Sequence, residues 1–213
     1  MLRHRFLFMK ILVTAGPTRE KIDPVRFISN YSSGKMGYSI AIAARELGHD
    51  VTLISGPVVL PEPCGIKLIK VVSAAEMAEA VHACAKDMDV IIMTAAVADY
   101  RPAQPFDSKM KKLPGKLVLD LERTEDILGS LGAGKNPGQL LVGFAAETDD
   151  LENNALGKLE RKNLDWIAAN LVADGFGTDT NKITLYQRNG SKIILPEGDK
   201  LTVARNMLKE ILP

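Results

Sequence analysis

The segment 32–37, Ser-Ser-Gly-Lys-Met-Gly, has the composition of a loop that binds an anion. It follows the apolar run 10–16 and precedes a helical pattern over 38–48, so it lies in a strand-to-helix connection. The first N–H groups of a helix have no partner within the helix, and the helix dipole adds partial positive charge there. We therefore expect a phosphate or carboxylate at this loop. The simpler alternative is that Ser32 or Ser33 caps the helix and that the glycines only turn the chain.

The common nucleotide-binding motifs do not fit this loop. Gly16, Gly34 and Gly37 do not form G-x-G-x-x-G, and the second strand ends at 54–57 without the acidic residue that would hold an NAD ribose. Met36 stands where a P-loop requires Ser or Thr after the lysine. The loop is therefore a candidate for a non-standard nucleotide or phosphate site.

Tyr31 and Lys35 have the Y-x-x-x-K spacing of the catalytic pair of short-chain reductases. That pair belongs on a helix well inside the domain, whereas these two residues flank a glycine in the first loop. We interpret the match as a coincidence, and an NAD(P)-dependent reductase is disfavoured.

Two further groups of lysines could meet an anion. The cluster 109–112, Lys-Met-Lys-Lys, lies in the proline-containing segment 100–116, whose length is typical of a lid or binding segment. A solvated loop is the alternative for such a basic cluster. Lys158 and Lys162 are four residues apart, so they share one face of a helix and repel each other unless an anion lies between them.

The elements that must position these residues alternate between apolar β-branched runs and helical patterns. Strands are expected at 10–16, 50–57, 65–72, 89–99, 116–122, 139–147 and 165–171. Helices are expected at 32–48, 73–88, 124–134, 151–163 and 201–212. This alternation predicts an α/β fold, a Rossmann-like, mostly parallel sheet with helices on both faces. Ligands of such sheets bind at the carboxyl ends of the strands.

The C-terminal part of the pattern differs from the rest. The runs 181–187 and 191–197 flank Arg188–Gly190, which predicts an antiparallel hairpin. An added hairpin leaves an edge strand with unpaired backbone groups, so we expect it or its neighbours to contribute to a homodimer. Ser73 and Glu76 form an S-x-x-E capping box for the second helix.

The composition is that of an ordinary globular chain of 213 residues, 46% hydrophobic and 25% charged. We expect one domain at 9–213, preceded by an N-terminal extension at 1–8. The net charge of +1 gives no overall field that would recruit nucleic acid or a membrane surface. Cys64 and Cys84 form no CxxC motif and the histidines are scattered, so a zinc site or disulfide framework is not expected. No apolar run reaches the ~20 residues of a membrane span, and a cytoplasmic protein is expected.

Five segments, in order along the chain, resemble phosphopantothenoylcysteine synthetase, the enzyme of coenzyme A biosynthesis that is often fused behind a flavin-dependent decarboxylase. They are VTAGPTREKIDPVRFISNYSSGKMG at 13–37, TAAVADYRP at 94–102, KMKK at 109–112, VGFAAET at 142–148 and ERKNLDWIAAN at 160–170. The resemblance covers residues 9–212.

The resemblance implies a Rossmann-like fold, a homodimer, and Mg²⁺ (or Mn²⁺) as cofactor. It also implies a two-step ligation in the bacterial members. CTP activates the carboxylate of 4′-phosphopantothenate as an acyl-cytidylate with release of pyrophosphate, and L-cysteine then displaces CMP to form the amide. The decarboxylase half is absent from the sequence, and association with a separate decarboxylase is expected.

The resemblance also assigns residues to roles. Asn30 contacts the acyl-cytidylate and supports its conversion, and an amide can donate to an acyl oxygen as charge develops there. Lys109 matches the lysine used in forming the cytidylate, where an ammonium offsets the repulsion between carboxylate and α-phosphate. The substrate-binding residues are expected to be Asn30, Ser32, Ser33, Gly34 and Lys35. The nucleotide-binding residues are expected to be Ala95, Ala96, Asp99, Lys109, Thr124, Glu125, Asp126, Ile127, Phe144, Lys158 and Lys162.

One departure from the family pattern concerns the turn at 123–127. Many relatives have K-N-P-D-I there, whereas this chain has Arg-Thr-Glu-Asp-Ile, so the geometry that a proline sets is missing. Three questions stay open at this stage. They are the choice between CTP and ATP, the magnesium ligands, and the base for cysteine, with Glu147 a candidate for either of the last two. A binding module without catalysis is the alternative function.

Overall fold

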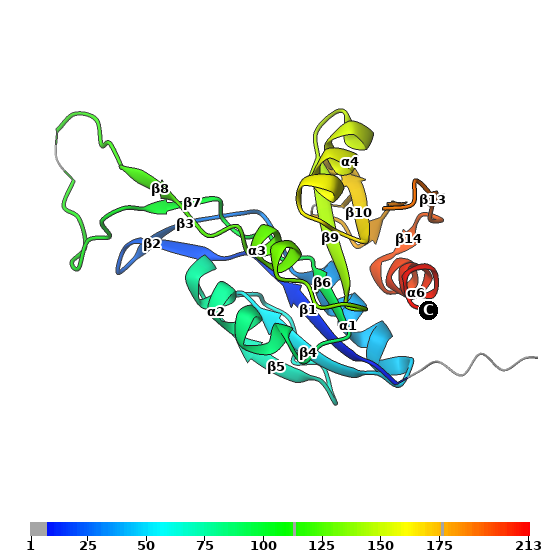
Figure 1. The fold of residues 1–213 in the computed structure, drawn as a ribbon. Helices are drawn as coiled ribbons and strands as arrows, with labels where there is room; N and C mark the ends of the chain where they lie inside the picture. The colour runs from blue at the N-terminus through cyan, green and yellow to red at the C-terminus, as the bar shows by residue number, and fades with distance from the viewer. Residues whose placement is uncertain (1–7, 113, 176) are drawn as a thin grey trace, which may run out of the picture.

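The structure is a computed structural model that describes residues 8–112, 114–175 and 177–213. The expected N-terminal extension at 1–8 lies outside the described residues, except for the exposed Phe8. The rest of the chain is built around one sheet with helices on both sides (Figure 1).

The main sheet of the described residues has eight strands in the order β13-β12-β10-β9-β6-β1-β4-β5. All neighbours are parallel except β10–β12 and β12–β13, which are antiparallel. In that order the strands are Lys192–Ile194, Thr184–Gln187, Trp166–Leu171, Leu140–Glu147, Val90–Met93, Lys10–Ala15, Asp50–Ser55 and Lys67–Lys70. The predicted mostly parallel sheet and its C-terminal hairpin are confirmed.

The helices form two layers because successive side chains of a strand point to opposite faces. From β1, Ile11 and Val13 pack with α1 and α6, whereas Leu12 packs on the opposite face with α2, α3 and α4. The helices are α1 (Lys35–Glu46), α2 (Ala74–Ala85), α3 (Ile127–Ala133), α4 (Leu151–Arg161), the short α5 (Val172–Gly175) and α6 (Lys200–Ile211). Helices therefore cover both faces of the sheet, as the sequence predicts.

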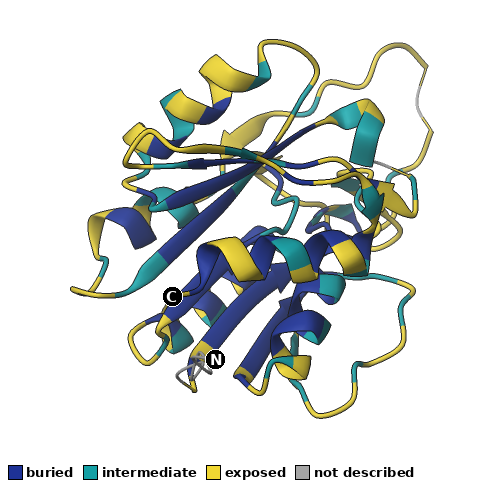
Figure 2. Cartoon of the chain, turned by 90° about the vertical axis from the view of Figure 1, so that its right-hand side faces the viewer, coloured by how far each residue is buried: buried dark blue, intermediate teal, exposed yellow. Residues whose placement is uncertain are grey.

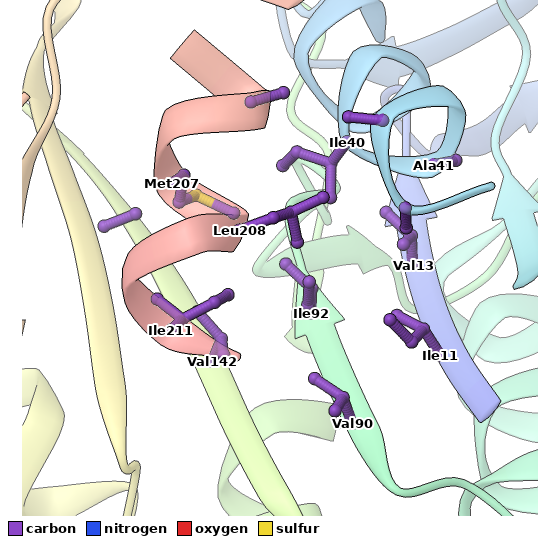
Figure 3. Close-up of a cluster of buried hydrophobic side chains, with 14 of the residues drawn as sticks. Ile11, Val13, Ile40, Ala41, Val90, Ile92, Val142, Met207, Leu208 and Ile211 are labelled. Atoms are coloured by element: carbon purple, nitrogen blue, oxygen red, sulfur yellow. The ribbon is translucent and has the colours of Figure 1, made fainter. Parts of the chain in front are cut away.

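The core between α1, α6 and the sheet is shown in Figure 3. Met207, Leu208 and Ile211 of α6 face Ile40 of α1 and the β6 residue Ile92. These side chains are at most 4% exposed. Figure 2 shows the buried strands between helices whose outer faces are exposed. This packing fixes the start of α1 against the carboxyl end of β1, where Gly37 lies so close to Ala15 that an added Cβ would stand 2.6 Å from the Ala15 Cβ.

The capping box at the start of α2 is confirmed in a modified form. The Ser73 hydroxyl accepts from the Glu76 backbone N–H at 3.2 Å. The Glu76 carboxylate accepts the backbone N–H of Val72, at 2.9 Å.

Part of the chain forms an arm that projects beyond the sheet (Figure 1). The arm consists of the hairpin β2–β3 (Arg19–Asp23 and Arg26–Ser29), the pair β7–β8 (Tyr100–Pro102 and Leu121–Arg123), and the residues described between β7 and β8, 103–112 and 114–120. The sequence pattern predicts no strand between the strand at 10–16 and the helix at 32–48, and it therefore misses the β2–β3 hairpin. The expected strand at 116–122 is also corrected, since only Leu121–Arg123 is extended and it pairs with β7 outside the main sheet.

A last two-stranded pair, β11 (Thr180–Asn181) with β14 (Gly198–Asp199), lies beside the start of α6. Within the described ranges, no helix combines the length and the hydropathy that a membrane span requires.

Candidate active site

Two adjoining cavities open at the carboxyl ends of the parallel strands β1, β6, β9 and β10. The α1 cavity has a volume of about 280 Å³ and lies at the N-terminus of α1. The α3 cavity has a volume of about 520 Å³ and lies beside the start of α3. Both are lined by Ala95, Val97, Asp99, Phe144 and Lys158. A ligand in one cavity would therefore share a wall with a ligand in the other.

The first turn of α1 faces the α1 cavity with its backbone N–H groups uncapped by any side chain. Its N-cap residue is Gly34, at φ 75°. Among the described residues, no side chain caps the helix with a hydrogen bond from this position. The Ser32 hydroxyl accepts instead from the N–H of Gly34 itself, at 3.3 Å. Ser32, Ser33, Gly34 and Lys35 all line the cavity. The alternative in which a serine caps this helix is wrong, and an anion would find open donors here.

Lys35 does not lie alone in this cavity. Its ammonium pairs with Asp179, and Lys200 at the start of α6 lines the same cavity. Lys200 is only 6% exposed and donates to the carbonyl oxygens of Gly175 and Thr178. Burial and the nearby Lys35 charge lower the pKa of Lys200, and Asp179 opposes that shift. Two cationic groups thus share one end of the cavity with a single carboxylate partner, which favours an anionic ligand.

Asn30 lies at the end of β3 and is held against the loop that follows β6. Its side-chain nitrogen donates to the carbonyl oxygens of Ala96 at 3.0 Å and Val97 at 3.3 Å. The same loop is held from the other side, because the N–H groups of Thr94 and Ala95 donate to the Thr14 hydroxyl, both at 3.1 Å. Ala95 and Ala96 line the α1 cavity with small side chains that leave room for a ligand close to the backbone.

Lys158 lies in the wall that the two cavities share. Lys158 of α4 donates to the carbonyl oxygen of Phe144 at 2.7 Å. Burial lowers the pKa of Lys158, while the nearby carboxylates of Glu147 and Asp99 act in the opposite direction. Asp99 is exposed at the junction of the cavities.

The turn at 123–127 lines the α3 cavity and is fixed without a proline. The Thr124 hydroxyl donates to the carbonyl oxygen of Ala98 at 2.6 Å, and the Thr124 N–H donates to that of Asp99 at 3.0 Å. Asp126 caps α3 by accepting from the N–H of Gly129 at 3.0 Å. Glu125 accepts from His82 of α2 and from Ser130.

Lys162 lines the α3 cavity and pairs with Asp126. Lys158 and Lys162, which are expected to repel each other, thus have separate partners. Lys158 donates to a carbonyl oxygen, and Lys162 pairs with a carboxylate. The structure thus gathers the expected nucleotide-binding residues around the two cavities, with Lys109 as the exception.

Lys109 lies on the arm, exposed, and is not among the described residues that line either cavity. The next residue, Met110, contacts the turn of the β2–β3 hairpin. From Arg26 at that turn to Asn30, four residues of extended chain span about 13 Å. Lys109 therefore lies away from the cavities of its own chain in this arrangement.

Several lining residues were not expected from the sequence. Asn170 is the penultimate residue of β10, so the rule that ligands bind at strand ends could have found it. Asn181 and Lys200 come from the C-terminal part of the chain, where no motif marks them. Glu147, the candidate base or metal ligand, lies outside the described lining and accepts from Asn154 at 3.2 Å.

We expect Lys158→Met to stabilise the fold and to weaken nucleotide binding. The pKa of Lys158 is lowered on folding, so the unfolded chain binds the proton more tightly than the folded chain does. The protonated lysine therefore lowers the free energy of unfolding at neutral pH. This destabilisation disappears as the pH rises toward the ordinary pKa of lysine. Removing this half-buried charge should raise the Tm by a few degrees, since about 1 kcal/mol corresponds to roughly 2–4 °C in a chain of this size. Thermal denaturation at pH 7 with and without CTP measures both effects. The exposed Lys182→Met is the matched control, and a lower Tm with an unchanged CTP response would contradict this account.

Comparison with known proteins places the chain in a family. Residues 7–213 match the family described as "DNA/pantothenate metabolism flavoprotein C-terminal domain". The chain is 53% identical over 205 residues to the coenzyme A biosynthesis bifunctional protein CoaBC of Bacillus subtilis (strain 168), covering 94% of this chain and 50% of that protein. It is 44% identical over 210 residues to CoaBC of Escherichia coli (strain K12), covering 96% of this chain and 52% of that protein. The chain thus spans about half the length of these relatives.

Solved structures agree with the sequence matches. The crystal structure of the C-terminal domain of CoaBC has a TM-score of 0.82 and 48% identity, covering 95% of this chain and 93% of that one. The DNA/pantothenate metabolism flavoprotein from Streptococcus pneumoniae has a TM-score of 0.81 and 26% identity, covering 95% and 98%. The chain therefore belongs to the family of the DNA/pantothenate metabolism flavoprotein C-terminal domain, and its resemblance to phosphopantothenoylcysteine synthetases is confirmed.

Proposed function

We propose that the chain is a cytoplasmic phosphopantothenate–cysteine ligase of coenzyme A biosynthesis. It joins 4′-phosphopantothenate to L-cysteine through an acyl-cytidylate, using CTP and releasing CMP and pyrophosphate. The observation that carries the proposal is the pair of cavities with a common wall, because a ligation through an acyl-nucleotide needs an anionic substrate and a nucleotide side by side. Similarity to proteins of coenzyme A biosynthesis supports it.

The charged and polar groups of the cavities fit an anionic substrate in the α1 cavity and the nucleotide in the α3 cavity. The α1 cavity offers open helix N–H groups and the cations Lys35 and Lys200 to a phosphate or carboxylate. The α3 cavity offers the backbone of the turn at 123–127 and Lys162 to the nucleotide. The carboxylate and the α-phosphate then meet at the shared wall, beside Asp99 and Lys158.

The chemistry needs no nucleophile from the protein. In the first step an oxygen of the substrate carboxylate attacks the α-phosphorus of CTP, and pyrophosphate leaves. In the second step the cysteine amino group attacks the acyl carbon, a proton leaves the nitrogen, and CMP departs with the bonding electron pair. Lys109 would offset negative charge in the first step, and Asn30 would support the acyl group in the second.

Asp99 fits a role in holding Mg²⁺ (or Mn²⁺). Magnesium in proteins usually has one or two carboxylate ligands and completes its shell with water and substrate phosphates. Asp99 is an exposed carboxylate at the junction of the cavities, and the described residues contain no preformed group of three or more candidate metal ligands. When bound, the metal would neutralise triphosphate charge.

The position of Lys109 supports a homodimer. Because the arm of one chain holds Lys109 away from its own cavities, a second copy could supply it. The exposed edge strand β13, with Ile194 64% exposed, lies at the opposite end of the molecule from the arm (Figure 1) and is a second, separate candidate surface for the dimer.

Light scattering at micromolar concentration is expected to give about twice the mass of the 23.1 kDa chain. If Lys109 acts in the partner, mixing and refolding two inactive variants, Lys109→Gln and Asn30→Asp, should restore part of the activity, since one composite site per mixed dimer is intact. A stable monomer would contradict the dimer. A decarboxylase is the proposed partner, since the relatives are bifunctional proteins of coenzyme A biosynthesis.

The ligase is tested by product analysis. Incubation with CTP or ATP, 4′-phosphopantothenate and cysteine should yield phosphopantothenoylcysteine and nucleoside monophosphate by mass spectrometry. Thermal shift with CTP, ATP and NADPH separates the alternatives, because a ligand stabilises the state that binds it. Stabilisation by CTP without product would indicate a binding module, and stabilisation by NADPH alone would indicate a reductase.

A further inference from the structure

The main chain next to Lys109 is attached at three points to the β2–β3 hairpin, although the two segments lie more than 80 residues apart in sequence. The Phe106 N–H donates to the carbonyl oxygen of Ile22 at 2.8 Å. The Met110 N–H donates to the Asp23 carboxylate at 3.2 Å, and the Arg26 guanidinium donates to the Met110 carbonyl oxygen at 3.0 Å. Both backbone polar groups of Met110, the residue that follows Lys109, are thus held by the hairpin.

The Asp23 carboxylate accepts hydrogen bonds both from its own turn and from the distant residue Met110. One carboxylate oxygen, Oδ1, accepts the N–H groups of Val25 at 2.8 Å and Arg26 at 2.9 Å, which is sufficient to close the turn. The second oxygen, Oδ2, accepts from the Met110 N–H and lies 3.6 Å from the Arg26 guanidinium. The Asp23 side chain is 0% exposed, although the arm around it is largely exposed. Burial of a carboxylate at such a place requires compensation by donors.

The charge state of Asp23 suits this role. Burial alone would raise its pKa, but the N–H groups of Val25 and Met110 and the charge of Arg26 together hold the pKa of Asp23 below its ordinary value. The carboxylate therefore stays ionised at neutral pH, and it bonds Met110 as a charge-assisted acceptor.

We propose that Asp23 is a positioning residue that acts through Lys109, by fixing the Lys109–Met110 peptide on the β2–β3 turn. The ammonium of Lys109 is then presented from an anchored main chain instead of a freely moving loop, which lowers the entropy cost of placing it on a triphosphate. The catalytic part of this inference rests on the proposed function, whereas the anchoring does not.

Asp23→Asn is expected to keep the hydrogen bonds within the turn and to remove the one from Met110. Asparagine keeps an oxygen for the turn N–H groups, but it places an NH₂ group where Oδ2 accepted from Met110, so two donors face each other. The rate of trypsin cleavage at Lys109–Met110 measures the anchoring directly, since Asp23 accepts the N–H of this peptide bond. The Lys116–Leu117 bond of the same segment is an internal reference that Asp23 does not contact.

We expect Asp23→Asn to raise initial cleavage at Lys109–Met110 relative to Lys116–Leu117 several-fold, measured by mass spectrometry at low conversion. Pyrophosphate release should fall at least tenfold in kcat with little change in CTP affinity. Arg26→Gln, at an exposed side chain, should raise the same cleavage ratio and serves if Asp23→Asn does not fold. Glu122→Gln, which breaks the Arg101 pair on the same arm, is the matched control and should change neither readout.

An unchanged cleavage ratio in both variants would overturn the anchoring. A raised ratio with unchanged pyrophosphate release would overturn its role in positioning Lys109. If the wild-type chain releases no pyrophosphate, the proposed function fails, and the cleavage ratio still decides whether Asp23 anchors this segment.

Discussion

Lys109→Gln is expected to abolish formation of the acyl-cytidylate, lowering pyrophosphate release by roughly a thousandfold or more. The carboxylate must approach the α-phosphate before any other bond changes, and both groups are negatively charged. Glutamine keeps much of the length of the lysine side chain but removes its charge, so the repulsion is no longer offset. Quenched single turnovers with CTP and 4′-phosphopantothenate, analysed by mass spectrometry, should show neither intermediate nor product.

Lys111→Gln is the matched control for this variant. It removes the same charge from the same exposed segment and leaves Lys109 in place. It should retain most of the wild-type rate. Equal losses in the two variants would show that the segment acts only through its overall charge.

Asn30→Asp is expected to form acyl-cytidylate but to block its conversion, so that the intermediate accumulates. The Asn30 amide donates to the carbonyl oxygens of Ala96 and Val97, and a carboxylate cannot donate to either. The added negative charge would also face the oxyanion that develops when cysteine attacks. Loss of a donor to a developing oxyanion typically costs ~3–4 kcal/mol, or about a hundred- to thousandfold in the step concerned.

The control for Asn30→Asp is Asn189→Asp in the β12–β13 turn. It adds the same charge on a distant exposed turn, and its side-chain oxygen still accepts the N–H of Ser191. Single-turnover analysis separates the two chemical steps, which steady-state constants mix. Finding acyl-cytidylate with Lys109→Gln and none with Asn30→Asp would overturn both assignments.

The sheet could be predicted because its strands are buried on both faces and therefore appear as continuous apolar runs. The run Val90–Met93 is one example, and all four of its residues are buried. The hairpin β2–β3 could not be found this way, since it stands on the arm with exposed residues such as Lys21 and Phe27 and has a proline at its turn. Its pairing is stabilised by long-range contacts, including those of Asp23, which no local pattern shows.

The candidate site was predictable in so far as it lies on motifs at strand ends. Ala95 and Asp99 come after β6, and Phe144 lies in the carboxyl-terminal half of β9, and ligands of such sheets bind at the carboxyl ends of the strands. Lys200 was not predictable, because a lysine at the start of a C-terminal helix looks like any exposed cation until the fold buries it in the α1 cavity. The location of Lys109 on the arm also depends on tertiary contacts alone.

The most direct test of the ligase is pyrophosphate release with cysteine omitted. An enzyme that forms an acyl-nucleotide first should release about one pyrophosphate per active site with CTP and 4′-phosphopantothenate alone, and should continue to turn over only after cysteine is added. ATP in place of CTP reveals the nucleotide preference in the same assay. Pyrophosphate release that requires cysteine from the start, or no release with either nucleotide, would contradict the acyl-nucleotide mechanism.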